Sequence, residues 1–186
     1  MSGDGGTALR ATVRPERPED VDAVQSVVAA AFGDEPVAEL LEDLRRNPAW
    51  LGLSLVAELD GEVVGHVSLT RAWVDDPARV VEVLVLSPLS VRPDRQGQGV
   101  GSALVKAALD LAGDRDEPLV FLEGDPAYYS RLSFATAGRL GFTAPSVRIP
   151  PQAFQVWTAP SYSGGVSGAL VYPDVFWRHD AVGLRP

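Results

Sequence analysis

Apolar residues recur at helical spacing in several parts of the chain. Val21, Val24 and Val28 form one such stripe, and the proline that precedes it is typical of the first turn of a helix. Leu104 and Ala108 belong to another stripe, directly after a glycine-rich run. The pattern predicts helices over 18–32, over 36–46, around 104–111 and, in a shorter segment, over 127–132.

Other segments alternate between apolar and polar residues, or are short and wholly apolar, and these predict strands. Asp60-Gly61 lies between two alternating segments and marks the turn of a hairpin. The apolar segment 119–123 is typical of a buried parallel strand. The predicted strands cover residues 9–14, 53–59, 63–73, 80–91, 119–123, 154–158 and 168–172.

A glycine-rich run joins the strand predicted over 80–91 to the helix that follows. Backbone N–H groups at a helix start are unpaired, and the helix dipole favours negative charge there. Glycine also lets a phosphate approach the backbone without meeting a Cβ atom. The run therefore predicts a site for a phosphate-bearing ligand.

Spacing separates the known kinds of phosphate loop. A P-loop needs Lys and Ser/Thr directly after its last glycine, whereas Gly101 is followed by Ser102, and Lys106, the only lysine, comes later. A dinucleotide fingerprint needs a third glycine where Ser102 stands. What remains is Gln-x-x-Gly-x-Gly, at Gln96, Gly99 and Gly101. The plain alternative is a glycine-rich helix start that only permits close packing.

This loop resembles the acetyl-CoA pyrophosphate loop of the GNAT superfamily of N-acetyltransferases, and the resemblance extends over about residues 10–177. Residues 13–20 resemble the first strand-to-helix entry of that superfamily. Residues 124–134 resemble its later strand-to-helix crossover, with Ser133 in place of the usual glycine before Phe134. Three C-terminal segments resemble the tail of the YhbS-like subgroup: residues 151–154, 165–168 and 171–176.

The resemblance implies an α+β, GNAT-like fold: a central, mostly antiparallel mixed sheet flanked by helices, with a cofactor wedge between two strands. Pro88 and Pro93 lack N–H donors, which agrees with interrupted sheet pairing at the wedge. Acetyl-CoA is the implied co-substrate. The residues indicated to bind it are Leu89, Ser90, Val91, Arg95, Gln96, Gly97, Gln98, Gly99, Val100, Gly101 and Ser102. Arg92 and Arg95 are each left open between a phosphate contact and a solvated surface position.

The resemblance also indicates a proton donor for the CoA thiolate. Tyr129 matches the family tyrosine five residues before Phe134. A phenol with a pKa of about 10 can protonate a thiolate as it forms, so Tyr129 is the predicted general acid. Tyr128 is expected to pack near the cofactor arm or in the core.

Transfer to an amine needs a base as well, because a lysine-like amine is almost wholly protonated at pH 7. The predicted catalytic carboxylate is Glu82, on the strand that leads to the wedge, where some family members place a base. Glu123, Asp125 and His66 are alternatives, as is a bound water that relays the proton to a distant carboxylate. The sequence leaves the choice among them open.

Composition and net charge limit the kinds of partner that this protein is expected to bind. The 186 residues suit one domain, and a net charge of −9 disfavours nucleic acid and weakly favours cationic acceptors. No apolar run is long enough to span a membrane and no signal peptide is visible, so a cytoplasmic protein is predicted. With no cysteine and only His66 and His179, no metal site is expected, and the acetyl group should pass directly to the acceptor.

The predicted organisation is a disordered leader over 1–8, a single N-acetyltransferase domain over 9–178 and a C-terminal tail over 179–186. The leading hypothesis is an enzyme that moves an acetyl group from acetyl-CoA to an amine of a small molecule or a protein. The alternatives are a non-catalytic acyl-CoA binding or sensor module and a nucleotide-binding protein of another fold. The sequence leaves open the acceptor, the use of other acyl-CoAs, and the choice between monomer and homodimer.

Overall fold

The computed structural model describes residues 11–33 and 36–183, and within these ranges nine strands form one mixed sheet. The strands are β1 Thr12–Pro15, β2 Trp50–Leu59, β3 Glu62–Asp76, β4 Arg79–Val91, β5 Leu119–Glu123, β6 Ala135–Thr136, β7 Phe142–Thr143, β8 Phe154–Thr158 and β9 Gly168–Val171. They lie in the order β1-β2-β3-β4-β5-β8-β6, and β9 pairs with both β3 and β7.

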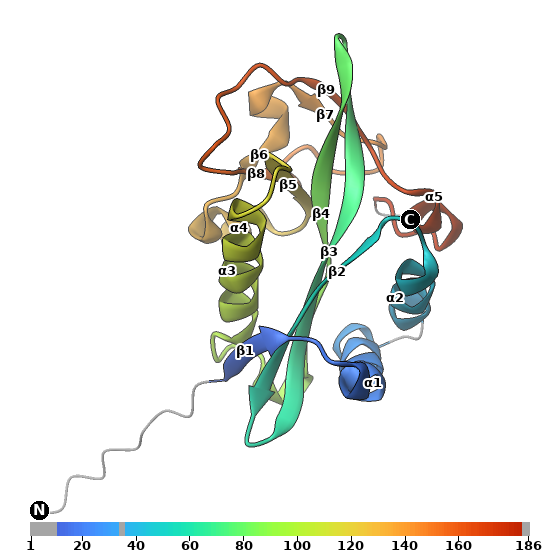
Figure 1. The fold of residues 1–186 in the computed structure, drawn as a ribbon, viewed down its shortest axis with the longest axis vertical. Coiled ribbons are helices and arrows are strands. Elements are labelled where there is room, and N and C mark those ends of the chain that lie inside the picture. The colour runs from blue at the N-terminus through green and yellow to red at the C-terminus, as the bar shows by residue number, and fades with distance from the viewer. Residues whose placement is uncertain (1–10, 34–35, 184–186) are drawn as a thin grey trace, which may run out of the picture.

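Helices cover both faces of this sheet. The α-helices are α1 Val21–Phe32, α2 Pro36–Arg46, α3 Val100–Gly113, α4 Pro126–Tyr129 and α5 Asp174–Arg178. The 3₁₀ turns are η1 Pro18–Asp20, η2 Pro93–Arg95, η3 Ser130–Leu132 and η4 Ala137–Leu140. Figure 1 shows α1, α2 and α5 on one side of the long central strands, and α3 and α4 on the other.

Most neighbouring strands of the main sheet run antiparallel, and the β4–β5 pair is parallel. The parallel pair needs a crossover connection, and α3 supplies it. The expected fold class, a mostly antiparallel mixed sheet flanked by helices, is therefore confirmed.

Alternation along the strands divides the core into two layers, because successive side chains point to opposite faces of a sheet. On one face Leu122 packs in a layer with Leu104 of α3. On the other face Phe121 packs in a layer with Leu44 of α2 and Phe176 of α5. The strand β5 is therefore buried on both sides, which explains its continuous apolar sequence.

Several predicted elements have the bounds that the structure gives, namely α2, β5 and β8. The helix predicted over 18–32 divides into η1 and α1, and the hairpin strands β2 and β3 are longer than predicted. The leader predicted over 1–8 lies outside the described residues, as does the predicted beginning of the first strand at residue 9. The two-residue strands β6 and β7 and the short helix α5 were not predicted, since so few residues carry no periodicity.

Residues 179–183, predicted to belong to a C-terminal tail, contact the rest of the fold. His179 Nε2 lies 2.7 Å from Asp43 Oδ2 on α2. Val182 is fully buried, and the backbone N–H of Gly183 donates to Glu123 at the end of β5, at 3.0 Å. The chain therefore returns to the sheet after α5.

A buried polar cluster joins the segment before η1 to the sheet. Ser54 Oγ lies 2.8 Å from His66 Nε2 and donates to Glu16, and Glu16 forms an ion pair with Arg45, whose Nη2 is 2.6 Å away. Burial alone would raise the pKa of Glu16, but hydrogen bonds from His66, Ser54 and Arg45 lower it to about 2. Burial lowers the pKa of His66, and Glu16 opposes this shift. His66 is therefore a neutral, structural residue of the folded protein.

The turn after η3 contains a non-glycine residue in the left-handed region. Ser133 has a φ of +69°, a conformation that costs an L-residue about 1–2 kcal/mol. We expect Ser133→Gly to raise the free energy of unfolding in urea by about 0.5–1 kcal/mol, because the relieved strain exceeds the added flexibility of the unfolded chain. Ser130→Gly is the control: Ser130 has a φ of −59°, so this change should destabilise the protein. Equal effects of the two variants would contradict the assigned strain.

The buried histidine predicts a pH-dependent stability. Histidine in an unfolded chain titrates near pH 6.5, whereas burial lowers the pKa of His66 in the folded state. Below about pH 6.5 the unfolded chain therefore binds more protons than the folded chain, and stability falls as the pH falls.

Urea unfolding between pH 7.5 and 5.5 measures this effect. The stability advantage of the wild type over His66→Asn should shrink by up to about 1.4 kcal/mol per pH unit below pH 6.5. The stability advantage of the wild type over His179→Asn serves as the comparison, because His179 is a partly buried histidine that is paired with Asp43. A constant difference between the wild type and His66→Asn would show that His66 does not change its protonation on unfolding.

Candidate cofactor cleft and active site

The strands β4 and β5 part after two residue pairs. Their parallel register joins Leu84 to Val120 and Val85 to Phe121. Beyond these pairs, β4 is held by β3 along its other edge, and β5 is held by β8. Within the described residues no sheet pair joins the inner edges further on, so a wedge opens between the strands as expected.

The glycine-rich run forms the turn from β4 into α3. Gly97 and Gly99 have φ angles of +72° and +85°, in the region that favours glycine, and a Cβ atom at either would meet nothing within 4 Å. No side chain caps the N-terminus of α3. The N–H groups of the first helical turn therefore face open space and are available to an anion.

A cleft of about 710 Å³ lies between the end of β4, which borders the wedge, and this loop. Its walls come from the end of β4, the glycine-rich run, the first turns of α3, and the segment from α4 to η3. The predicted cofactor residues that line it are Leu89, Val91, Arg95, Gln96, Gly97, Gly99, Gly101 and Ser102. Four further residues line it: Lys106, Tyr128, Arg131 and Leu132. The structure thus gathers most of the predicted set around one cleft.

Three predicted cofactor residues do not line the cleft. Ser90 is buried and pairs with His66, on the sheet face opposite to its neighbours. Gln98 donates through Nε2 to the carbonyl of Asp94 at 3.1 Å, so its side chain braces the loop. Val100 packs into the core beneath α3.

Arginine 92, left open by the sequence, is engaged away from the cleft. Arg92 donates to Asp94 at 2.6 Å and to Glu62 at 3.0 Å. These two carboxylates raise the pKa of the Arg92 guanidinium. Its role is to tie the turn after β4 to the start of β3.

Lys106 lines the cleft but was not among the predicted cofactor residues. The sequence did indicate its position, because Lys106 lies four residues after Ser102 on the same helix face.

The two neighbouring tyrosines have different surroundings. The ring of Tyr128 lines the cleft, and its hydroxyl lies 3.4 Å from Ser102 Oγ. The ring of Tyr129 packs edge-on against Tyr128 at 4.9 Å and against Phe134 at 5.6 Å. Gly124 at the end of β5 makes room for Tyr129, since a Cβ atom there would lie 2.8 Å from Tyr129 Cδ2. Burial, and secondly Tyr128, raise the pKa of Tyr129, so its phenol stays protonated at neutral pH.

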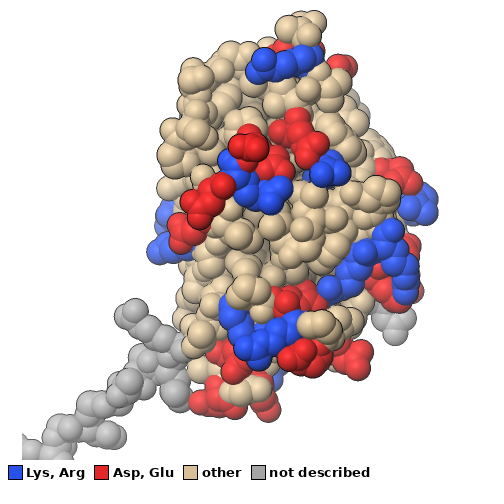
Figure 2. All heavy atoms as spheres, viewed as in Figure 1, with Lys and Arg blue, Asp and Glu red and all other residues tan. Residues whose placement is uncertain are grey.

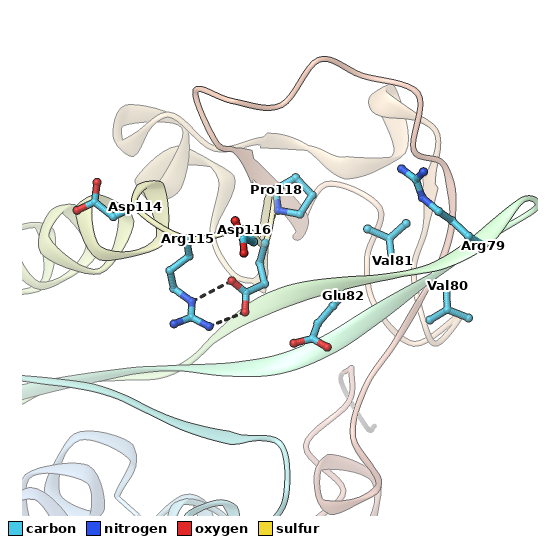
Figure 3. Close-up of a pocket in the computed structure, with 9 residues that line it drawn as sticks. Arg79, Val80, Val81, Glu82, Asp114, Arg115, Asp116 and Pro118 are labelled. Carbon is cyan, nitrogen blue, oxygen red and sulfur yellow. Dashed lines mark hydrogen bonds and ion pairs between the residues drawn. The ribbon is translucent and has the colours of Figure 1, made fainter.

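Glu82 lies in a different hollow. Figure 3 shows it on β4 beside a hollow of about 660 Å³, where Arg115 and Glu117 form an ion pair at 2.7 Å. The Glu82 carboxylate pairs with Arg71 at 2.7 Å. The paired segment of β4 and β5 separates Glu82 from the wedge, so the structure does not bring the predicted base together with Tyr129.

The other candidate bases also have distinct positions. His66 is enclosed in the buried cluster with Ser54 and Glu16. Asp125 caps α4, because its carboxylate accepts from the backbone N–H of Ala127 at 2.8 Å. Neither lines the cleft, and neither does Glu123.

Glu123 lies at the mouth of the wedge. It is the last residue of β5, two positions beyond the last β4–β5 pair, and it is half-buried. Its Oε2 accepts from the N–H of Gly183, while Oε1 is buried without a hydrogen bond. Burial raises the pKa of Glu123, although Gly183, Tyr172 and the charge of Arg148 oppose the shift. A carboxylate with a raised pKa and a free oxygen is suited to accept a proton near neutral pH.

Two further observations concern metal-binding groups and membrane-spanning helices among the described residues. No group of three or more His, Cys, Asp and Glu side chains among them could hold a metal ion. No helix in the described part of the chain is long and apolar enough to cross a membrane.

The sequence and the fold match known acetyltransferases. The acetyltransferase (GNAT) family matches residues 16–142. The N-acetyltransferase YjhQ of Escherichia coli K12 is 35% identical over 147 residues, which cover 76% of this chain and 79% of that protein. The N-acetyltransferase YhbS of the same strain is 32% identical over 170 residues, covering 89% of this chain and 98% of that protein.

Solved structures of GNAT family acetyltransferases are also similar to this chain. The crystal structure of YhbS from Escherichia coli in complex with CoA has a TM-score of 0.82 at 31% identity, covering 91% of this chain and 93% of that one. A GNAT family acetyltransferase from Brucella melitensis in complex with acetyl-CoA has a TM-score of 0.73 at 28% identity, covering 90% of this chain and 99% of that one. The chain therefore belongs to the GNAT family of acetyltransferases, as a YhbS-like member.

Proposed function

We propose that this acetyltransferase moves an acetyl group from acetyl-CoA directly to an amine, either of a small molecule or of a protein. The observation that carries the proposal is a cleft that lies between an uncapped helix N-terminus and the end of β4, the strand that borders the wedge. A phosphate-bearing ligand with an extended arm fits such a cleft. The related structures that contain CoA and acetyl-CoA support this ligand.

The residues present fit that co-substrate. The N–H groups after Gly99 would bind the pyrophosphate, with Arg95 at the cleft wall adding positive charge. The unpaired inner edges of β4 and β5 would bind an extended arm by main-chain hydrogen bonds, as an added strand is bound. Leu89 and Val91 would cover the arm with apolar surface. Acetyl-CoA itself supplies the activated thioester.

Tyr129 is the proposed proton donor. Its ring packs over Gly124, beside the mouth of the wedge and on the face of α3 and α4. Burial keeps the phenol protonated at neutral pH, so Tyr129 holds the proton that it would donate to the sulfur as the carbon–sulfur bond breaks. The same burial makes the phenol a weaker acid than an exposed tyrosine. The thiolate then leaves as a thiol.

Glu123 replaces Glu82 as the proposed base. Alternation along β5 places Glu123 on the face opposite to Leu122 and to the α3 layer. The acceptor would approach from that face while the cofactor lies on the other. Glu123 would take the proton from the ammonium group, after which the amine nitrogen bonds to the acetyl carbon.

The function itself is tested by two measurements on the same protein. Calorimetric titration with acetyl-CoA measures binding, and release of free CoA thiol in the presence of a panel of amines measures transfer. Binding with transfer to at least one amine is the expected result. Binding without transfer to any of them would favour the acyl-CoA sensor, and absence of binding would remove acetyl-CoA as the ligand.

The role of Tyr129 predicts a loss of turnover without a loss of cofactor affinity. Tyr129→Phe should lower kcat by about 10²-fold, a typical contribution of a general acid, with the Kd for acetyl-CoA within twofold of wild type. Tyr128→Phe is the matched variant: its hydroxyl contacts Ser102 in the cleft, so the change should act on Kd more than on kcat. The reverse pattern would assign the acid to Tyr128.

The role of Glu123 predicts an altered pH profile. Its raised pKa means that wild-type kcat/KM should fall as the pH decreases through a value above the usual 4.5 of glutamate. Glu123→Gln should lower kcat/KM at pH 7 by about 10²-fold or more and should remove that acidic limb. Glu82→Gln distinguishes the two carboxylates. A larger effect at Glu82 than at Glu123 would return the base to Glu82.

A further inference from the structure

A second hollow continues from the cofactor cleft along α3. It has a volume of about 500 Å³ and lies between the later turns of α3, the turn η3 and the strand β8. Three residues line both spaces: Lys106, Arg131 and Leu132. The two spaces therefore meet where a lysine of α3 and an arginine of η3 stand together.

Lys106 and Arg131 lack acidic partners among the described residues. Most arginine side chains of the described residues form ion pairs, including Arg14, Arg45, Arg71, Arg92, Arg95 and Arg115. Figure 2 shows the same pattern on one face, where basic atoms lie beside acidic atoms. No ion pair engages Lys106 or Arg131 in the described part of the chain, and Arg131 has one hydrogen bond, from Nε to the carbonyl of Ala127 at 3.0 Å.

The polarity of the two hollows places an anion at their junction. Lys106 lies one helical turn beyond Ser102, on the side of α3 that lines the cofactor cleft. Further along α3, Asp110 and Asp114 line the second hollow. A negatively charged group is therefore favoured beside Lys106 and Arg131 and disfavoured beyond them.

The direction of the cofactor determines which group reaches this junction. In the proposed function the pantetheine arm enters the wedge and the pyrophosphate binds the N-terminus of α3. The nucleotide end must then leave the loop on the side away from the wedge, towards Lys106 and Arg131. This end carries a phosphate monoester on the ribose, which has a charge of about −1.5 to −2 at pH 7.

We propose that Lys106 and Arg131 bind the ribose 3′-phosphate of CoA, so that the protein selects CoA over its 3′-dephosphorylated form. This assignment rests on the proposed function. Both side chains are exposed and flank the cleft from separate elements, so they can close on the phosphate from two sides. Their charge also offsets the repulsion between a polyanionic ligand and a protein with a net charge of −9.

Calorimetry with CoA and with 3′-dephospho-CoA tests the assignment. The wild type should bind CoA at least about tenfold more tightly, because charge-assisted hydrogen bonds to the extra phosphate are lost in the shorter ligand. Lys106→Gln combined with Arg131→Gln should remove most of this ratio, because the double change should weaken the binding of CoA far more than the binding of 3′-dephospho-CoA. Each single variant should retain part of the ratio.

Arg139→Gln is the matched control, because Arg139 is an exposed arginine on η4 that lines neither hollow. It changes the net charge as each single variant does and should leave the ratio unchanged. Equal wild-type affinity for the two ligands would overturn the 3′-phosphate site alone, with the proposed function intact. A ratio that survives the double variant would also overturn it. Absence of binding by either ligand would overturn the proposed function together with this site.

Discussion

The separation of β4 from β5 is the constraint on which the rest of the structure depends. Each strand is held along its outer edge, β4 by β3 and β5 by β8, so neither can move to close the wedge without breaking those pairs. The inner edges carry main-chain donors and acceptors that sheet pairing leaves unused beyond Val85 and Phe121. An unpaired backbone polar group costs free energy when water is excluded, so this edge favours an extended, hydrogen-bonding ligand. The wedge is therefore prepared for such a ligand by the sheet itself.

The wedge also gives the two proposed proton-transfer groups separate surroundings. Tyr129 is held by aromatic packing on the α3 face, where burial keeps its phenol neutral. Glu123 is held from the opposite face by Gly183, near the buried Val182, where burial raises its pKa. Both shifts arise from desolvation, yet they have opposite uses: one group retains its proton and the other becomes a stronger acceptor. In the proposed mechanism the acid and the base thus lie on opposite faces of β5, without contact between them.

Local patterns predicted the parts of the fold that local forces determine. The apolar stripe of α2, the wholly apolar β5 and the segment of β8 gave their bounds directly, and the glycine spacing located the loop. The base was predicted at Glu82, because the sequence does not state where β4 and β5 stop pairing, and that point depends on β8 and on the return of residues 179–183. Ser90 and Gln98 were assigned to the cofactor by their neighbours in the chain. Strand alternation turns Ser90 away, and a backbone hydrogen bond engages Gln98. Tertiary pairing, which no short window contains, decided the cases of Glu82 and Ser90, whereas the bond of Gln98 to Asp94 is local.

The net charge of the whole chain likewise does not predict the charge at the site. A net charge of −9 suggests a poor binder of a polyanion, and the average field of the protein does oppose one. However, exposed charges beyond about 8 Å are largely screened at physiological ionic strength, so the groups at the cleft decide the local potential. There the α3 dipole points its positive end at the loop, and Arg95, Lys106 and Arg131 line the wall. Several carboxylates elsewhere form ion pairs with arginines, which reduces their long-range effect. An acidic protein can therefore maintain a cationic cleft, because the sign of the binding surface is set by the charges that line it and not by the sum over the chain.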